Sequence, residues 1–222
     1  MQRYFLDKDK LITKDDIHHI LNVMRTKDKT QVEVCSNGTC FLAELNISGK
    51  DVSYTKISEV DSNKLKSVTL VQGLPKGDKM ETVTKYATIF GAEKIVFVPM
   101  VRSIAKMANE DHKLQRLTKI SKEAAELAKY SSVPVIEFAN SIKSLDLKNK
   151  TIILLDENEK DHQIDDVLPQ IKNDSVILIV GPEGGIDDKE RALLSSLNAI
   201  FVSLGKTIYP TELAHIPFLV KF

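Results

Sequence analysis

The chain has few cysteines, no excess of either charge and no long hydrophobic run. Lysine and arginine together number 31, and so do aspartate and glutamate, so the formal net charge is zero. Any nucleic-acid site must therefore be a local patch rather than a field spread over the whole molecule. No stretch approaches the length that crosses a bilayer, and the first residues lack the apolar core of a signal peptide. These absences predict a cytoplasmic protein that does not bind a membrane.

The cysteines are only two, Cys35 and Cys40. There is no second pair to build a framework, and no histidine stands at the spacing typical of a zinc site. The sequence therefore predicts neither a disulfide framework nor a metal site. With 222 residues and 42% hydrophobic content, the chain has room for one large domain or two modest domains with packed cores.

The N-terminal part reads as a small β domain. Alternating apolar and polar residues at 31–36 and 39–45 flank Asn37-Gly38, a pair that suits a type I′ turn because both central residues need positive φ. Residues 51–57 form another alternating stretch, and 15–25 have the apolar spacing of a short helix. The pattern predicts a β meander with one helical insertion.

The polar run 61–66 predicts a boundary between a first domain, residues 1–66, and a second domain, residues 67–222. Past the boundary, a strand at 67–72, a helix beginning near residue 78 and a strand at 94–99 follow one another. A strand, a helix and a second strand in this order predict a right-handed crossover and a parallel sheet.

The stretch 176–185 reads V-I-L-I-V-G-P-E-G-G. Its five apolar residues predict a buried strand, and the glycines that follow allow a ligand to approach the backbone closely. Strands predicted at 151–155 and 199–203 also end in polar loops. Because open parallel sheets bind ligands beyond the carboxyl ends of their strands, we expect these three loops to share one site.

The loop does not have the spacing of a phosphate-binding glycine motif, and Glu183 would repel a phosphate. A neutral or cationic ligand is favoured. The alternative is that the loop is only a tight turn between a strand and a helix.

The motifs G-P-E-G-G, S-L-G-x-x-I and T-E-x-A together resemble the SPOUT methyltransferases. Within them, L-P-K-G-D-K-M-E and G-A-x-x-I-V-x-V-P-M-V-x-R-S are similar to the RsmE family, which methylates N3 of a uridine in small-subunit (16S) ribosomal RNA. The resemblance covers nearly the whole chain. It implies a trefoil-knotted α/β domain, an N-terminal PUA-like β-barrel that holds RNA, a homodimer, and S-adenosylmethionine as methyl donor without a metal.

The resemblance also implies a cofactor site made by the loops near Leu155, Gly181 and Leu204. Fixed backbone groups would bind the polar edges of the cofactor, and Glu157 and Glu183 would favour its positive charge, with simple surface exposure as their alternative. The predicted cofactor-binding residues are Leu155, Glu157, Val180, Gly181, Glu183, Gly184, Ser203, Leu204, Gly205 and Ile208.

Uridine N3 carries a weakly acidic proton that must leave before the nitrogen can attack a methyl group. The reaction therefore needs a general base, or a cation that makes the nucleobase more acidic. Glu212 is the candidate base and Arg102 the candidate cation. Alternatively, Glu212 stabilises the N-terminus of the last helix and Arg102 pairs with a surface carboxylate.

Arg3, Arg25 and Lys76 are the candidate RNA-binding residues, with solvated surface charge as the alternative. The expected partner is RNA of the small ribosomal subunit, not DNA. The apolar residues of 208–222 would supply the dimer interface or, alternatively, ordinary core.

Two places depart from the family pattern. Leu127 and Tyr130 replace a glutamine and an arginine, and the last loop, Lys206 to Ala214, lacks two arginines. Three hypotheses therefore stay open: a uridine-N3 methyltransferase, a relative that binds RNA or ribosome precursors without catalysis, and a methyltransferase for another RNA position.

Overall fold

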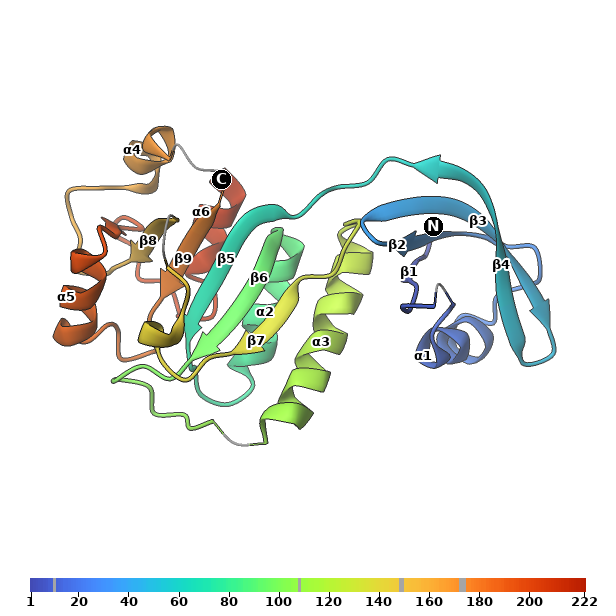
Figure 1. Ribbon diagram of the computed structural model, residues 1–222, viewed down its shortest axis with the longest axis horizontal. Helices are drawn as coiled ribbons and strands as arrows, with labels where there is room; N and C mark the ends of the chain where they lie inside the picture. The colour runs from blue at the N-terminus through green and yellow to red at the C-terminus, as the bar shows by residue number, and fades with distance from the viewer. Residues whose placement is uncertain (10, 108, 148–149, 172–174) are drawn as a thin grey trace. The chain divides into compact units, whose positions relative to one another are not determined.

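The computed structural model describes residues 1–9, 11–107, 109–147, 150–171 and 175–222 (Figure 1). The chain divides into two compact units. The N-terminal unit consists of residues 1–65 together with 122–133, and the C-terminal unit consists of residues 66–121 and 134–222. Each unit has a hydrophobic core of its own.

The N-terminal unit is built on one sheet with strand order β1-β2-β3-β4. The predicted hairpin is confirmed, and Asn37 and Gly38 have φ of 52° and 77° as its turn requires. The predicted short helix is confirmed, although its second half is π-helical. The elements are β1 (Arg3–Phe5), α1 (Lys14–His18), η1 (His19–Val23), β2 (Gln31–Ser36), β3 (Thr39–Ser48) and β4 (Asp51–Val60).

This sheet is open. In the part of the chain that the structure describes, β1 lies at one edge and β4 at the other, and they do not pair, so no closed barrel is seen. Its core side chains include Val34 and Leu45 from the central strands, with Tyr4 of β1 and Ile20 of η1 packed in the same cluster. One face of the sheet is therefore covered by the helical insertion.

Cys35 and Cys40 form a single disulfide, which the sequence analysis did not predict. The two residues stand directly opposite each other on β2 and β3, with their Cα atoms 4.1 Å apart. The number of cysteines indicates only whether a framework of several disulfides is possible. A single bridge depends on the register of the hairpin, which places these two side chains face to face.

The C-terminal unit contains a six-stranded sheet in its described residues, with order β10-β8-β9-β5-β6-β7. Every pair of neighbours is parallel, which confirms the predicted parallel α/β architecture. The strands are β5 (Lys66–Gly73), β6 (Ala92–Val98), β7 (Val135–Phe138), β8 (Thr151–Leu155), β9 (Val176–Val180) and β10 (Ile200–Val202).

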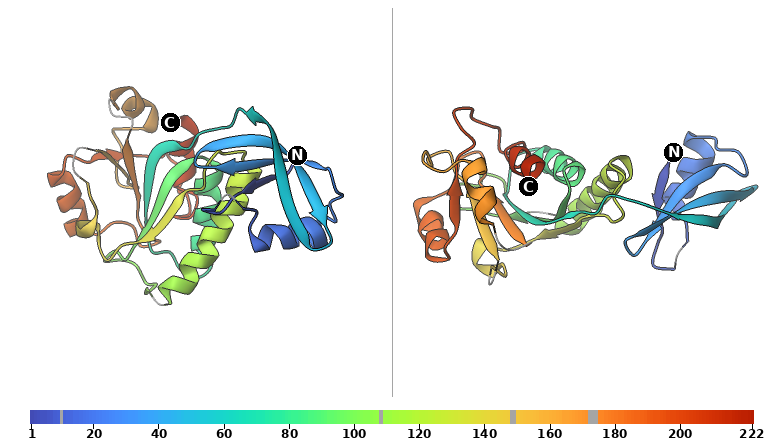
Figure 2. Two further views of the ribbon diagram at one scale, coloured as in Figure 1. Left: turned by 45° about the vertical axis from the view of Figure 1, so that its right-hand side comes forward. Right: turned by 90° about the horizontal axis from the view of Figure 1, so that it is seen from above.

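Helices cover both faces of this sheet (Figure 2). Val83 of α2 and Phe218 of α6 pack in the core on one face, and Leu194 of α5 and Ile142 of η2 pack in the core on the other. Successive residues of β9 alternate between these cores, which explains why the whole strand is apolar. The helices are α2 (Lys79–Ile89), α3 (Glu110–Leu127, whose residues from 122 onward belong to the N-terminal unit), η2 (Ile142–Ser144), α4 (Ile164–Val167), η3 (Leu168–Gln170), α5 (Asp188–Ser196) and α6 (His215–Lys221).

Within the described residues, no helix combines the length and the apolar character that crossing a membrane requires.

Candidate functional site

A cavity of about 370 Å³ lies beyond the carboxyl ends of the central strands. Leu155 ends β8, Val180 ends β9, and Ser203 follows β10, and all three residues line this cavity. The strands are parallel and β8 lies between β9 and β10, so their ends meet at one edge of the sheet. The three strand ends therefore meet around one cavity, as the sequence predicted.

Nine of the ten residues that the sequence assigned to the cofactor line this cavity. The tenth, Gly184, lies against Arg102 instead, since a Cβ added to it would come within 3.0 Å of the Arg102 Cβ. The nine are Leu155, Glu157, Val180, Gly181, Glu183, Ser203, Leu204, Gly205 and Ile208.

The glycine-rich loop after β9 is folded tightly against its surroundings. Gly185 has φ of +72°, and a Cβ there would stand 2.7 Å from the Glu157 carboxylate. At the end of β5, a Cβ on Gly73 would stand 2.6 Å from Pro182. A larger residue at position 73 would clash with Pro182, and at position 185 the positive φ itself disfavours other residues, so glycine suits the shape of the loop at both positions.

A buried amide fixes the base of the cavity. Gln72 in β5 is fully buried, and its side-chain nitrogen donates to the Thr211 hydroxyl at 2.8 Å and to the Gly181 carbonyl at 3.3 Å. Thr211 in turn donates to the same carbonyl of Gly181. Since Gly181 and Thr211 both line the cavity, these bonds join the loop after β9 to the loop before α6.

Three charged side chains meet beside the cavity. The ammonium of Lys79 lies 3.1 Å from the carboxylate of Glu183 and 3.1 Å from that of Glu212. Glu183 also accepts a hydrogen bond of 3.0 Å from the backbone N–H of Lys76. Lys79 and Glu183 line the cavity. Glu212 does not line it, but its carboxylate pairs with Lys79.

The ionisation of this group follows from its contacts. Burial alone would raise the pKa of Glu183, but the backbone N–H of Lys76 and the ammonium of Lys79 outweigh it and lower that pKa. The pKa of Lys79 is raised, chiefly by its hydrogen bond to Glu212 and further by the Glu183 carboxylate, while desolvation opposes the shift. Lys79 therefore stays protonated and Glu183 stays ionised near neutral pH.

Two other carboxylates on the cavity wall differ in their availability. Asp156 is buried and pairs with Arg191 of α5, so its charge is already compensated within the protein. Glu157 is exposed and lies beside Gly185. Glu157 is thus the better placed of the two to attract a cationic ligand.

Arg102, the candidate cation, is exposed on the outside of the glycine-rich loop. Its guanidinium donates to the Gly184 carbonyl at 3.1 Å, and Arg102 is not among the described residues that line the cavity. Of the RNA candidates, Lys76 and Arg25 are exposed.

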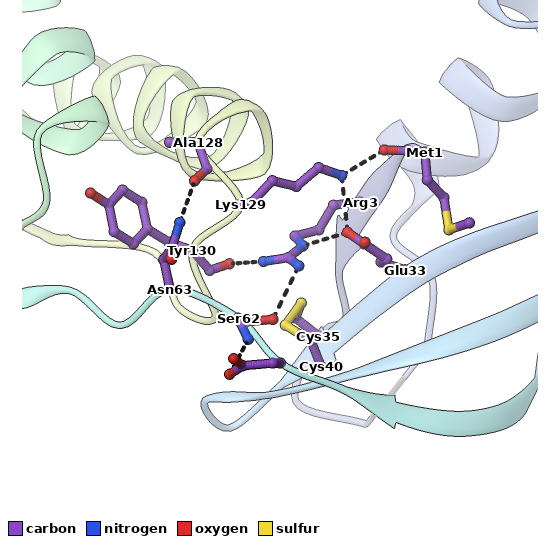
Figure 3. A network of polar contacts seen from close by, with 11 residues as sticks. Met1, Arg3, Glu33, Cys35, Cys40, Ser62, Asn63, Ala128, Lys129 and Tyr130 are labelled. Carbon is purple, nitrogen blue, oxygen red and sulfur yellow. Dashed lines mark hydrogen bonds and ion pairs between the residues drawn. A yellow bond between two sulfur atoms is a disulfide. The ribbon is translucent and has the colours of Figure 1, made fainter.

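Arg3, the third RNA candidate, is buried, and Figure 3 shows its polar contacts. Its guanidinium donates to Glu33 at 2.9 Å, to the Tyr130 carbonyl at 2.8 Å and to the Ser62 hydroxyl at 3.1 Å. Lys129 also pairs with Glu33, which lowers the pKa of that carboxyl although burial alone would raise it. A phosphate could reach Arg3 only after these contacts break.

The sequence reasoning missed Lys79, Gln72 and Thr211. One signal for Lys79 was available, because a lysine in the first turn of a predicted helix opposes the helix dipole and needs a compensating partner. Gln72 offered a second signal as a polar residue near the end of an apolar strand. Among the described residues, no group of three or more His, Cys, Asp or Glu side chains is placed to hold a metal.

The comparisons with known proteins agree with this geometry. A sequence profile of the RNA methyltransferase domain matches residues 61–220. The chain is 32% identical to the ribosomal RNA small subunit methyltransferase E of Bacillus subtilis strain 168, over 96% of this chain and 93% of that protein. It is also 32% identical to the enzyme of the same name from Rickettsia conorii strain Malish 7, over 94% of this chain and 86% of that protein.

A solved structure has the same fold. It is the ribosomal RNA small subunit methyltransferase E of Neisseria gonorrhoeae bound to S-adenosylmethionine, with a TM-score of 0.82. Its sequence is 22% identical, and the match covers 100% of this chain and 96% of that one. With the family profile and the two relatives, we conclude that the chain belongs to the ribosomal RNA small subunit methyltransferase E family.

Proposed function

We propose that this protein transfers a methyl group from S-adenosylmethionine to N3 of a uridine in small-subunit ribosomal RNA. The observation that carries the proposal is the cavity at the ends of β8, β9 and β10, which is lined by nine of the ten residues that the sequence analysis assigned to the cofactor. Membership of the family gives the reaction and the RNA. The Neisseria gonorrhoeae protein, which has the same fold, binds S-adenosylmethionine.

The residues around the cavity suit this cofactor. The volume of the cavity falls within the range of roughly 300 to 1,000 Å³ that is usual for small-molecule sites. Leu204 and Ile208 offer apolar contacts for an adenine, and the exposed carboxylate of Glu157 favours a positive charge, whereas Glu183 is already paired with Lys79. When bound, S-adenosylmethionine supplies an electrophilic methyl group, and it needs no metal.

Methyl transfer is an in-line displacement, so the protein must hold the nucleophile and the methyl carbon in line. We propose Glu212 as the base that removes the N3 proton, since its carboxylate lies 3.1 Å from the ammonium of Lys79, which lines the cavity. We propose that Arg102 meets an RNA phosphate or the target base, because it is exposed next to the same loop.

We further propose the finer architecture that the family resemblance implies. Residues 1–66 would act as a PUA-like RNA-binding domain, with Arg25 contacting RNA, and Lys76 would contact RNA from the second domain, residues 67–222. The second domain would be threaded as a trefoil knot, which the convergence of its three strand-end loops supports. The cytoplasm is the expected location, because the relatives are named for ribosomal RNA.

We propose a homodimer formed partly through 208–222. Ile208 is 76% exposed and Val220 58% exposed, which supports this role for them. Phe218 and Leu219 are fully buried in the core of their own unit and are not available to a partner.

The test is a methylation assay. Small ribosomal subunits from cells that lack the protein are incubated with the purified chain and S-adenosylmethionine, and the ribosomal RNA nucleosides are mapped by mass spectrometry. We expect N3-methyluridine to appear at one position. No new methylation would favour the hypothesis of a non-catalytic RNA-binding relative, and methylation at another atom would favour a different target.

A further inference from the structure

Lys79 occupies an unfavourable place for a cation. It is the first residue of α2, an 11-residue helix, where the helix dipole presents partial positive charge. Other positions on the same helix, such as that of Lys85, are exposed and would carry a lysine without this penalty. A cation at the start of α2 therefore calls for a specific reason.

Carboxylates from two separate loops surround this ammonium. Glu183 comes from the loop after β9 and Glu212 from the loop before α6, and each lies 3.1 Å from Nζ of Lys79. Glu183 is itself fixed by the backbone N–H of Lys76 at 3.0 Å. The ammonium is thus held in a set position on the cavity wall, and 36% of the Lys79 side chain stays exposed to a ligand.

We propose that Lys79 is a catalytic residue, and that its ammonium stabilises the negative charge that the uracil ring acquires when N3 loses its proton. This inference rests on the proposed function and deepens it. It assigns to Lys79 the role that the sequence analysis gave to Arg102, because Lys79 lines the cavity while Arg102 donates to the outside of the loop.

The charges balance along the reaction. The N3–H bond breaks, its proton goes to the Glu212 carboxylate, and its electron pair stays on the uracil ring. Glu212 becomes neutral, so the ammonium of Lys79 keeps only Glu183 as an ionised partner and can pair with the uracil anion beside it. N3 then forms a bond to the methyl carbon, the sulfur–carbon bond breaks, and its electron pair stays on sulfur.

Lys79 suits this role better than it would suit that of a base. Its hydrogen bond to Glu212 raises its pKa, so it remains charged through the neutral range. A cation that is already in position needs no rearrangement when the charge develops, which is how fixed groups contribute most to catalysis.

The experiment compares Lys79→Met, Lys79→Arg and the matched control Lys85→Met from the exposed side of α2. Single-turnover methylation is measured from pH 6.5 to pH 9.5 on the full chain, with calorimetric binding of S-adenosylmethionine and thermal unfolding as parallel readouts. We expect Lys79→Met to slow methylation about 10²-fold at neutral pH. Lys79→Arg should restore most of the rate, and Lys85→Met should match the wild type.

Two further results separate a charge-stabilising role from a structural one. Raising the pH should recover part of the Lys79→Met rate, because a larger share of N3 is then already deprotonated. A target RNA made with 5-fluorouridine should narrow the gap between Lys79→Met and the wild type, because fluorine makes the N3 proton more acidic. A lysine that only supports the fold would show neither effect.

A wild-type rate for Lys79→Met would overturn the inference while the proposed function stands. A reduced methylation rate of Lys79→Met that neither higher pH nor the 5-fluorouridine RNA increases would also overturn it. If the wild-type chain itself forms no N3-methyluridine, both the proposed function and this inference fall. If Lys79→Met does not fold, Lys79→Gln is measured in its place, with the same expectations.

Discussion

Arg3 in the N-terminal unit and Lys79 in the C-terminal unit are both cations paired with glutamates, but they differ in what surrounds them. The side chain of Arg3 is 2% exposed, and its contacts are with Glu33, Ser62 and a backbone carbonyl (Figure 3). The side chain of Lys79 is 36% exposed at a cavity. The same kind of ion pair is therefore enclosed within the fold in one unit and borders an open cavity in the other.

The comparison shows that burial, not residue type, decides which charge is available for function. A buried guanidinium with several partners is costly to disturb, because removing one partner leaves another charge buried and unpaired. A half-exposed ammonium contributes little to stability in the high dielectric of the surface. Substitutions in the two clusters should thus separate a loss of stability from a loss of activity.

The largest expected effect is that of Glu212→Gln on catalysis. Removing the proposed base should slow methylation by about 10² to 10⁴-fold. Glutamine keeps the shape of the side chain, so the affinity for S-adenosylmethionine should change little. Single-turnover methylation and calorimetry measure the two quantities, and a Glu212→Gln protein with the wild-type rate would remove Glu212 as the base.

The next effect should appear in the N-terminal unit and concern stability alone. Arg3→Met should lower the free energy of unfolding by about 3 kcal/mol, because it removes the buried member of the two cations that pair with the partly buried Glu33. Arg25→Met, at an exposed position, is the control and should stay within about 0.5 kcal/mol of the wild type. Urea unfolding checks both. Equal stability of the two variants would contradict the comparison.

His215 provides a pH test confined to the C-terminal unit. It is fully buried, and burial lowers its pKa from 6.5 to about 3. Between these values the unfolded chain binds one proton more than the folded chain, so stability falls as the pH falls, by about 1.4 kcal/mol per pH unit. His215 alone should therefore remove about 2 kcal/mol between pH 6.5 and pH 5.

Urea unfolding of the wild type and of His215→Leu at pH 7, 6 and 5 tests this expectation. The variant should lose less stability than the wild type as the pH falls. Parallel pH dependence in the two proteins would mean that His215 titrates normally. Glu126 in the N-terminal unit should act in the opposite sense. Burial, though opposed by Lys122, raises its pKa to about 7. The stability that the protonated Glu126 contributes is therefore lost as the pH rises above 4.5.

The smallest expected effect distinguishes two buried threonines of the C-terminal unit. Thr211→Val removes the hydroxyl that joins Gln72 to Gly181 beside the cavity, and Thr88→Val removes one that bonds to Ser121 in the core. Each should lower stability by about 1 kcal/mol. Only Thr211→Val should also weaken binding of S-adenosylmethionine, by about 5-fold. Equal affinities in the two variants would argue that the hydrogen bonds among Gln72, Thr211 and Gly181 do not shape the cavity.

Local patterns predicted most of the fold. The alternation around Asn37-Gly38 is enough to specify a hairpin, since few residues accept positive φ. The apolar run of β9 predicted a strand buried on both faces, and the order of strands and helices predicted the parallel sheet. From these, the meeting of three strand ends follows by geometry, so the sequence located the cavity as well.

Contacts between distant parts of the chain could not be predicted in the same way. Arg3 resembled a surface cation because its carbonyl partner, Tyr130, lies 127 residues away in the sequence. The disulfide depended on which residues of β2 and β3 stand opposite each other. The partners of Lys79 belong to two loops that only the completed sheet brings together. In each case the deciding factor is tertiary, and no local pattern contains it.

The central claim is that the cavity at the strand ends is the S-adenosylmethionine site, and hydrogen–deuterium exchange of the full chain with and without this cofactor tests it most directly. We predict slower exchange on addition of the cofactor in residues 155–157, 180–186 and 203–211, which line or border the cavity. The hairpin strands β2 and β3 of the N-terminal unit should exchange as before. Unchanged exchange in all three loops, or protection confined to the N-terminal unit, would contradict the account.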